Sequence, residues 1–394
     1  MKFNKWTLGL AAVGAVSLTS VVQAEEKMNA VSTALSGTTI SGYVDTSMQW
    51  NVGTGNANLP GYAFGGTSKA DGFNLNVVQL TISKALDESE WAAGYRADLW
   101  FGPDANTLAT TSSGIATSDL AIRQAYVALR TPVGNGIDWK VGVFDTIIGY
   151  ETLEDGNNPN MTRSYGFSLE PTTQTGLLAT YRFTDSIAVS GGVVDTVGPT
   201  INGRSNIESY KAYTGSVALT APSNWGWLAG SSLYGGVLCG WDLNATTGVN
   251  AGGTRDNYYV GATVNTPVTG LKAGVSFDYV HMWGSATTSG SVISPVFAAA
   301  NVDNQYAWAL YVSYQATEKM SLHGRAETIR EQGQVAGSNN EAYALTGTVQ
   351  YDLWQNVISR AEIRWDHGDQ PSYGSTTDLQ RNAVMVAANI IYKF

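Results

Sequence analysis

The sequence of 394 residues is poor in cysteine and in charged residues. Its single cysteine, Cys239, excludes an intrachain disulfide. Asp, Glu, Lys and Arg make up 14% of the chain, against about 25% in an average soluble domain. Uncharged side chains must therefore make up much of the surface. The formal net charge of −10 argues against nucleic acid as a partner.

Long hydrophobic runs are also missing, apart from one at the beginning of the chain. Residues 1–24 place Lys2 and Lys5 before a short apolar run and a small-residue site, which predicts a signal peptide cleaved after Ala24 and a periplasmic lead at 25–37. A membrane anchor is the alternative, but the run is short and interrupted by Thr and Ser. No later stretch reaches the about 18 apolar residues of a transmembrane helix. The expected destinations are periplasm, outer membrane or medium.

Residue patterns for catalysis are scarce as well. The chain has three histidines, His281, His323 and His367, and no nucleophile-elbow serine, metal-spaced His/Cys cluster or phosphate loop. We therefore predict no enzymatic activity, no cofactor and no metal site. An outer-membrane protease or phospholipase, whose site assembles from distant strands, is the remaining enzymatic alternative.

A hydrophobic period of two fills almost all of the chain after residue 38. Between residues 305 and 315, for example, Trp308, Leu310 and Val312 point one way while Ala309 and Tyr311 point the other. About 16 such segments can be counted, bounded by Gly, Asn, Asp, Ser and Thr. They lie at 38–51, 72–84, 89–101, 118–130, 137–145, 174–183, 186–197, 210–221, 225–240, 256–265, 270–284, 304–316, 318–331, 341–353, 355–367 and 381–394.

The connections between these segments alternate between short and long. Since amphipathic helices are nearly absent, only a second sheet or lipid can cover the apolar faces of so many strands. Short turns at one end and long loops at the other are typical of outer-membrane barrels. We therefore predict an all-β fold, a transmembrane antiparallel up-and-down β-barrel of about 16 strands over residues 38–394, with short periplasmic turns and long extracellular loops. This fold implies the outer membrane of a Gram-negative bacterium and contact with its lipid.

The last segment carries a second indication of that location. Alternate residues up to Tyr392 and the terminal Phe394 occupy one face, while Asn389 and Lys393 occupy the other. A chain ending on an outward aromatic resembles the C-terminal strand of outer-membrane proteins in general. The resemblance implies recognition by the barrel assembly machinery.

Several short motifs resemble the family of OmpL-like β-barrel porins. The resemblance is strongest over residues 120–195 and implies an outer-membrane porin. Its motifs are Arg123-Gln124-Ala125-Tyr126-Val127, Val141-Gly142-Val143-Phe144-Asp145-Thr146, Gly149-Tyr150-Glu151, Thr162-Arg163-Ser164, Pro171 with Thr175-Gly176, and the early Gly42-Tyr43-Val44-Asp45.

The expected function is therefore passive diffusion of small hydrophilic solutes and ions through a water-filled channel. One alternative is a substrate-specific channel, such as one for saccharides, because five aromatic residues alternate to the inside. They are Tyr43, Trp100, Phe144, Tyr259 and Tyr311. Another alternative is a structural or adhesion barrel without an open pore. Association into a homotrimer is left open.

Charged residues of both signs also fall on the predicted inner face. We hypothesise that a basic ladder with acidic partners sets up a transverse field that orients polar solutes and biases ion selectivity. The simpler alternative is that these residues only pair and hydrate the interior. The predicted pore-lining residues are Arg96, Asp98, Arg123, Lys140, Asp278, Arg325, Glu327, Arg360, Glu362, Arg364 and Asp366.

The longest connection, residues 146–173, is the candidate constriction loop. It follows the fifth strand and carries Glu151, Glu154 and Asp155. In 16-stranded porins the loop at this place folds inward, so the resemblance implies the same here; an external, solvent-exposed loop is the alternative. The oxygen-rich run 154–160 would also suit Ca²⁺, although a Gly/Asn/Pro turn explains the same residues.

Overall fold

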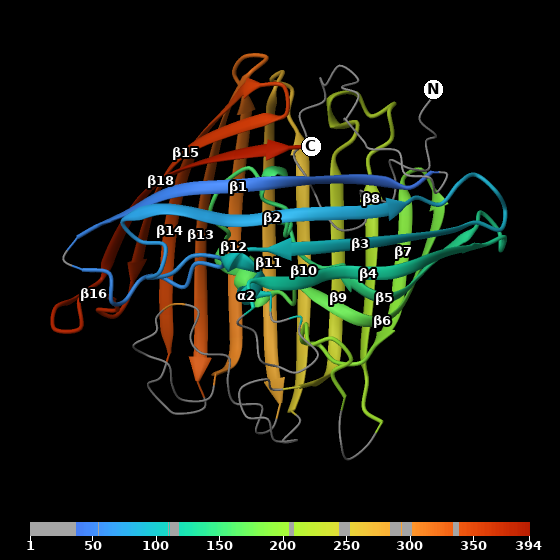
Figure 1. Ribbon diagram of the computed structural model, residues 1–394, viewed down its shortest axis with the longest axis horizontal. Helices are drawn as coiled ribbons and strands as arrows, with labels where there is room; N and C mark the ends of the chain where they lie inside the picture. The colour runs from blue at the N-terminus through green and yellow to red at the C-terminus, as the bar shows by residue number, and fades with distance from the viewer. Residues whose placement is uncertain are drawn as a thin grey trace.

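The computed structural model describes residues 37–53, 55–108, 110, 118–204, 209–243, 253–283, 293, 302–333 and 339–394. Sixteen antiparallel strands form one closed barrel in the order β1-β18-β15-β14-β13-β12-β11-β10-β9-β8-β7-β6-β5-β4-β3-β2. In Figure 1 strands β1 to β5 cross in front of β8 to β14, which form the opposite wall. The predicted signal peptide and all but the last residue of the predicted lead lie outside the described residues.

Each predicted segment corresponds to one strand of the barrel, which confirms the predicted fold. The strands are β1 (Thr39–Val52), β2 (Gly72–Lys84), β3 (Ala93–Phe101), β4 (Leu120–Thr131), β5 (Ile137–Asp145), β6 (Thr173–Thr184), β7 (Ile187–Val194), β8 (Ala212–Thr220), β9 (Ser232–Asp242), β10 (Gly253–Asn265), β11 (Leu271–Trp283), β12 (Val302–Gln315), β13 (Met320–Gly333), β14 (Asn340–Trp354), β15 (Val357–Gly368) and β18 (Asn382–Lys393).

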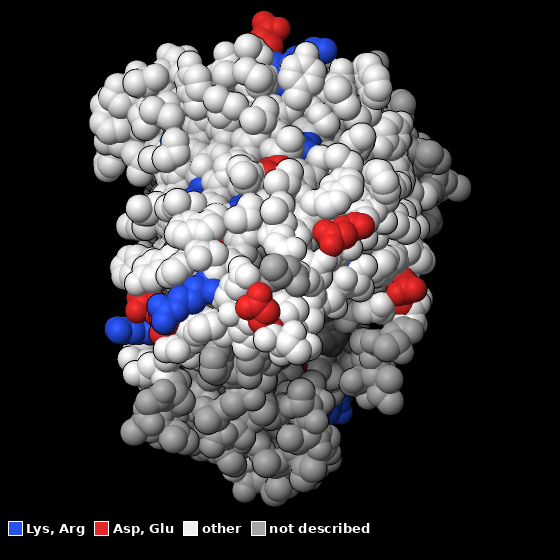
Figure 2. All heavy atoms as spheres, turned by 90° about the vertical axis from the view of Figure 1, so that its left-hand side faces the viewer, with Lys and Arg blue, Asp and Glu red and all other residues white. Residues whose placement is uncertain are grey.

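The alternation of side chains assigns one face of each strand to the outside. On β12, Trp308 and Leu310 are 52% and 60% exposed, while Ala309 and Tyr311 between them are buried. Lipid can cover such an outer band, because a closed barrel leaves no backbone group of its strands unpaired. Figure 2 shows a face of the molecule on which Lys, Arg, Asp and Glu are sparse.

The first and last strands close the barrel. β1 pairs with β18, with Tyr43 opposite Lys393. The terminal residue extends this pairing, since the amide of Gly42 donates to the carbonyl of Phe394 and the amide of Phe394 donates to the carbonyl of Gly42, both at 2.9 Å. Closure removes the sheet edges that would otherwise be open to aggregation.

The predicted connections contain more structure than the sequence indicated. The connection after β3 holds α2 (Pro103–Thr107), the one after β5 holds η1 (Asp155–Asn157) and α3 (Tyr165–Leu169), and the one after β15 holds the hairpin β16 (Tyr373–Gly374) and β17 (Leu379–Gln380). The predicted boundaries are most in error at β9, which begins at Ser232 because η2 (Gly226–Leu228) occupies part of the predicted strand; β3 also begins later than predicted, at Ala93, and β7 ends earlier, at Val194. Among the described residues, no helix is long and apolar enough to cross a membrane.

Candidate constriction site

The connection between β5 and β6, residues 146–172, lies inside the barrel. Near its start, Tyr234 of β9 donates to the carbonyl of Ile147. The ring of Tyr150 then stacks on Tyr311 of β12, with 4.1 Å between the ring centroids. Further on, Glu154 accepts from Arg123 of β4. The loop therefore contacts widely separated parts of the inner wall.

Three arginines of the predicted ladder donate to the backbone of this loop. Arg325 donates to the carbonyl oxygens of residues 162 and 163 at 2.6 and 3.1 Å. Arg364 donates to the carbonyl of residue 163 at 2.7 Å. Arg360 donates to the carbonyls of residues 158 and 160, both at 3.1 Å. A planar guanidinium with several fixed donors suits this task, because it can satisfy more than one loop carbonyl at once.

Carboxylates on the same two strands of the wall accept hydrogen bonds from amides of the loop. Glu362 accepts from the amides of residues 161 and 162 at 2.6 and 2.9 Å. Glu327 accepts from the amide of Tyr165 at 2.6 Å, and the hydroxyl of Tyr165 donates to Asp366 at 2.6 Å. Strands β13 and β15 thus hold the loop through donors and acceptors in alternation.

These contacts correct the prediction that the ladder faces water. The side chains of Arg325 and Arg364 are at most 1% exposed, and each is paired with wall carboxylates such as Glu327. Buried charges of opposite sign satisfy one another and leave little free field. The other predicted pore-lining residues that are less than one-tenth exposed are Asp98, Arg123, Asp278, Arg360, Glu362 and Asp366.

Water reaches charged groups on the β3–β5 side of the loop. The side chains of Arg96, Asp145 and Glu154 are 32%, 30% and 26% exposed. Glu154 accepts from Arg123 at 3.0 Å and from Arg96 at 3.2 Å. Burial opposes ionisation of Glu154, but the two arginines outweigh it and lower its pKa to about 2. Lys140, also on the inner face, lies over the ring of Tyr126 at 4.9 Å.

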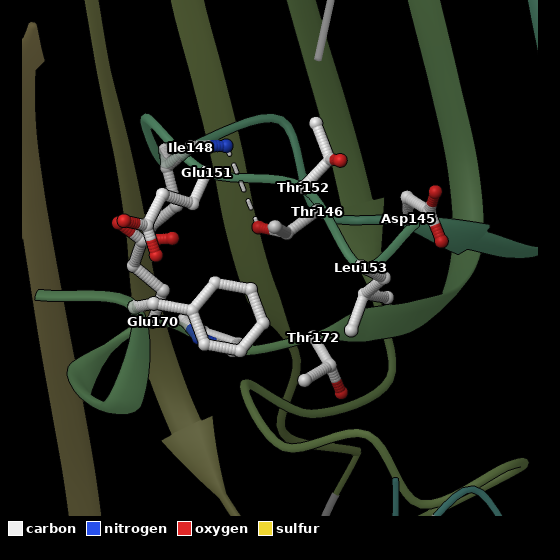
Figure 3. A pocket seen from close by; sticks show the side chains of 10 residues that line it. Asp145, Thr146, Ile148, Glu151, Thr152, Leu153, Glu170 and Thr172 are labelled. Atoms are coloured by element: carbon white, nitrogen blue, oxygen red, sulfur yellow. Dashed lines mark hydrogen bonds between the residues drawn. The ribbon is translucent and has the colours of Figure 1, made fainter. Parts of the chain in front are cut away.

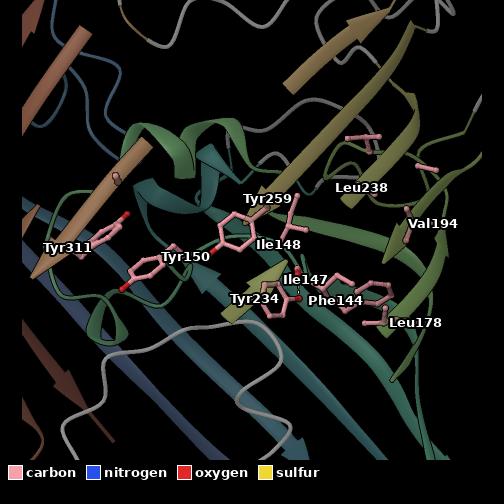
Figure 4. Packing of buried hydrophobic residues seen from close by; sticks show 13 residues of the cluster. Phe144, Ile147, Ile148, Tyr150, Leu178, Val194, Tyr234, Leu238, Tyr259 and Tyr311 are labelled. Atoms are coloured by element: carbon pink, nitrogen blue, oxygen red, sulfur yellow. Dashed lines mark hydrogen bonds between the residues drawn. The ribbon is translucent and has the colours of Figure 1, made fainter. Parts of the chain in front are cut away.

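The inward aromatic residues form a buried row, which Figure 4 shows running from Tyr311 through Tyr150 and Tyr259 to Tyr234. Tyr259 and Tyr311 are each 1% exposed, and the loop residues Ile147, Ile148 and Tyr150 pack among them. Sugar slides need exposed ring faces, so this packing does not favour the saccharide alternative. The remaining aromatics of that prediction, Tyr43, Trp100 and Phe144, are also buried.

A second loop, described over residues 55–71, packs against the first. Tyr62 donates to Asp366 at 2.9 Å, and the guanidinium of Arg364 lies over its ring at 4.7 Å. Phe64 contacts Trp100 edge-on at 5.6 Å and Phe167 of α3 at 5.9 Å. The sequence patterns gave no indication of a role for Tyr62 or Phe64. Two aromatic side chains within a polar, glycine-rich loop were the available signal.

A small cavity lies within the loop, between Glu151, Glu170 and Asp145 (Figure 3). Its volume of about 30 Å³ is room for about one water molecule, too little for a solute site. The structure does not favour the calcium alternative either, because arginine side chains pair with the carboxylates of the run 154–160. Glu154 pairs with Arg123, and Asp155 pairs with Arg163 at 2.7 Å. Within the described ranges, no three His, Cys, Asp or Glu side chains are grouped to hold a metal.

Known proteins resemble the chain in family and in fold. The family described as "Putative beta-barrel porin-2, OmpL-like" matches residues 37–394. Among solved structures, OmpF of Salmonella typhi, in a complex with daunomycin, has a TM-score of 0.61 at 12% identity, covering 91% of this chain and 98% of OmpF. The outer membrane channel DcaP of Acinetobacter baumannii has a TM-score of 0.59 at 12% identity, covering 92% and 99%.

OmpT, an outer membrane protein of Vibrio cholerae, has a TM-score of 0.57 at 12% identity, covering 93% of this chain and 100% of OmpT. At these identities the structures show a shared fold. Among curated proteins none matches this sequence.

Proposed function

Because the chain belongs to the family of OmpL-like β-barrel porins, we propose that it forms a water-filled channel for passive diffusion of small hydrophilic solutes and ions across the outer membrane. The family and the fold point to a channel rather than an enzyme. We further propose that residues 1–24 are a signal peptide cleaved after Ala24, that residues 25–37 are a periplasmic lead, and that the short turns face the periplasm.

The observation that supports this function most strongly is the place of loop 146–172. A closed barrel of 16 strands leaves a wide interior, and the loop reduces its cross-section from within. The remaining passage is proposed beside the water-exposed side chains Arg96, Asp145 and Glu154. The loop residues Glu151, Glu154 and Asp155 then belong to the constriction, with Glu154 facing the passage and the other two anchoring the loop.

Planar-bilayer recording of the refolded chain 25–394 tests the proposal. We expect discrete, long-lived conductance steps, because an open barrel passes ions without a gating ligand. A preparation that is folded, as shown by heat-modifiable migration on a gel, yet gives no steps would contradict the porin function and favour the structural or adhesion barrel. A mock preparation refolded without the protein is the control for contaminating channels.

A further inference from the structure

The charged residues that face the interior of the barrel are distributed unevenly along its axis. Among the five residues of each strand nearest to the short turns, seven inward-facing side chains are Lys or Arg and only two are Asp. Strands β3 to β6 carry Arg96, Arg130, Lys140 and Arg182, with Asp138. The others are Lys272 of β11, Arg360 of β15 and Lys393 of β18, with Asp352 of β14. We call these seven cations the cationic collar.

The cationic collar lies next to the constriction loop, on its short-turn side. The ammonium group of Lys393 donates to the carbonyl of Gly156 in η1 at 3.4 Å. Arg360 donates to the carbonyls of residues 158 and 160, both at 3.1 Å. A solute that passes the loop beside Glu154 therefore meets the collar as the next part of the inner wall.

Two members of the collar, Lys140 and Arg182, carry charge that no nearby carboxylate offsets. Both side chains are half-buried, and neither forms an ion pair within the part of the chain that the structure describes. The ammonium group of Lys140 lies 4.9 Å from the ring centroid of Tyr126, a contact that holds the cation in place without neutralising it. By contrast, two hydrogen bonds of 2.6 and 2.8 Å pair Arg130 with Asp138. The charges of Lys140 and Arg182 are therefore available to a solute.

The opposite end of the barrel has no such surplus of cations. Among the five residues of each strand nearest to the long loops, inward carboxylates such as Asp242 and Glu331 outnumber the inward arginines. Arg255 lies 4.0 Å from Asp242. The net positive charge of the inner wall therefore lies on the short-turn side of the constriction.

The short turns beyond the collar carry carboxylates, but these are exposed to bulk water. They include Asp87, Glu88, Asp185 and Glu318. Salt at about 0.1 M screens exposed charges over about 10 Å. Charges that line a narrow passage with low-dielectric walls act more strongly on ions inside it, because the walls focus the field. We therefore expect the collar, rather than the turns, to set the ion selectivity.

We propose that the cationic collar makes the channel selective for small anions, with carboxylates and phosphates as the class of solute. The proposal rests on the porin function proposed above and names its substrate class. Ammonium and guanidinium groups bind carboxylates and phosphates through charge-assisted hydrogen bonds. The surplus of positive charge raises the local concentration of anions beside the constriction and thereby the rate at which they pass.

Reversal potentials across a planar bilayer under a salt gradient test this selectivity in the refolded chain 25–394. In potassium chloride at about 0.1 M we expect the anion to be about threefold more permeant than potassium. The preference for the anion should persist when lactate or phosphate replaces chloride. It should weaken at about 1 M salt, where the screening length falls to about 3 Å. An open channel that prefers potassium would overturn the proposal.

A pair of charge reversals locates the selectivity within the collar. Lys140→Glu combined with Arg182→Glu should lower the permeability ratio of chloride to potassium to about one. Lys319→Glu combined with Arg381→Glu makes the same change of charge at exposed residues outside the strands. This matched control should keep the original ratio. Heat-modifiable migration on a gel shows that both variants fold, and equal ratios in the two would overturn the proposal.

Calorimetric titration of the refolded protein with citrate, a trivalent carboxylate, measures anion binding without depending on conduction. At low salt we expect citrate to bind the original chain and to bind about tenfold more weakly when Lys140→Glu and Arg182→Glu are combined. Citrate binding without any conductance would refute the porin function and support the collar as an anion site. Conductance with neither an anion preference nor citrate binding would overturn the collar and support the porin function.

Discussion

At the scale of single residues, Arg325 makes the most connections between wall and loop. Its side chain is fully buried and donates to Glu151 and Glu327, each at 2.9 Å, as well as to the loop carbonyls of residues 162 and 163. Lysine carries three donors on one nitrogen and could not reach these acceptors in the same plane. The contacts of Arg325 therefore depend on the planar shape of the guanidinium group as much as on its charge.

We predict that Arg325→Met destabilises the barrel by about 3–5 kcal/mol, because it leaves the buried carboxylate of Glu151 without its cation and leaves Glu327 with Arg364 alone. Urea unfolding in lipid vesicles measures this change. Arg330→Met, on the same strand, is the matched control: its side chain is 57% exposed and its contact with Glu341 is 4.0 Å, so the loss should stay below about 1 kcal/mol. Equal losses in both variants would show that Arg325 does not anchor the loop.

At the scale of elements, loop 146–172 behaves as an internal domain of the barrel rather than as a surface connection. Its short helix α3 begins with a cap, since Ser164 accepts from the amide of Phe167 at 3.2 Å. Its positive backbone angle at Gly149, φ 122°, allows the chain to turn next to Glu170. Long connections of this kind are uncommon in compact folds and are usually functional.

Deleting residues 152–161 should raise single-channel conductance, because the segment that contacts β1, β4 and β15 would be missing from the interior. A shortened hairpin turn lacking residues 375–378, which lie between β16 and β17, is the control and should leave conductance near its original value. If the two deletions give the same conductance, the loop does not narrow the channel.

At the scale of the whole molecule, the barrel depends on the pairing of its two end strands. Gly42 must remain small there, since a β-carbon would collide with the carbonyl of Gln79 and contact the ring of Phe394 at 2.8 Å. The two backbone hydrogen bonds between Gly42 and Phe394 extend the seam to the last residue. The C-terminus therefore takes part in closure as well as in its predicted role as an assembly signal.

Removal of Phe394 should lower the folded fraction of the protein, because two hydrogen bonds of about 1 kcal/mol each and an aromatic contact are lost at the seam. The fraction of heat-modifiable protein in isolated outer membranes measures this effect. Phe394→Tyr preserves the backbone pairing and an outward ring, and it should restore assembly. Normal assembly of the truncated chain would contradict both roles of this residue.

Local periodicity was sufficient to predict the strands and their faces. An alternation such as that of Trp308, Ala309 and Leu310 assigns each side chain to one face without knowledge of the rest of the chain. For the same reason the inner position of Arg325 and Arg364 could be predicted. The motifs Gly149-Tyr150-Glu151 and Thr162-Arg163-Ser164 likewise pointed to the right family.

The tertiary structure alone decided which inner residues contact water. Glu151 and Arg325 are 174 positions apart, and Tyr62 and Asp366 are 304 positions apart. A period of two records which face a residue occupies, but it carries no information about the loop that later covers that face. The ladder residues therefore became loop anchors, and water-exposed charge remained near β3 to β5, because burial depends on contacts that form only when the barrel closes around its own loops.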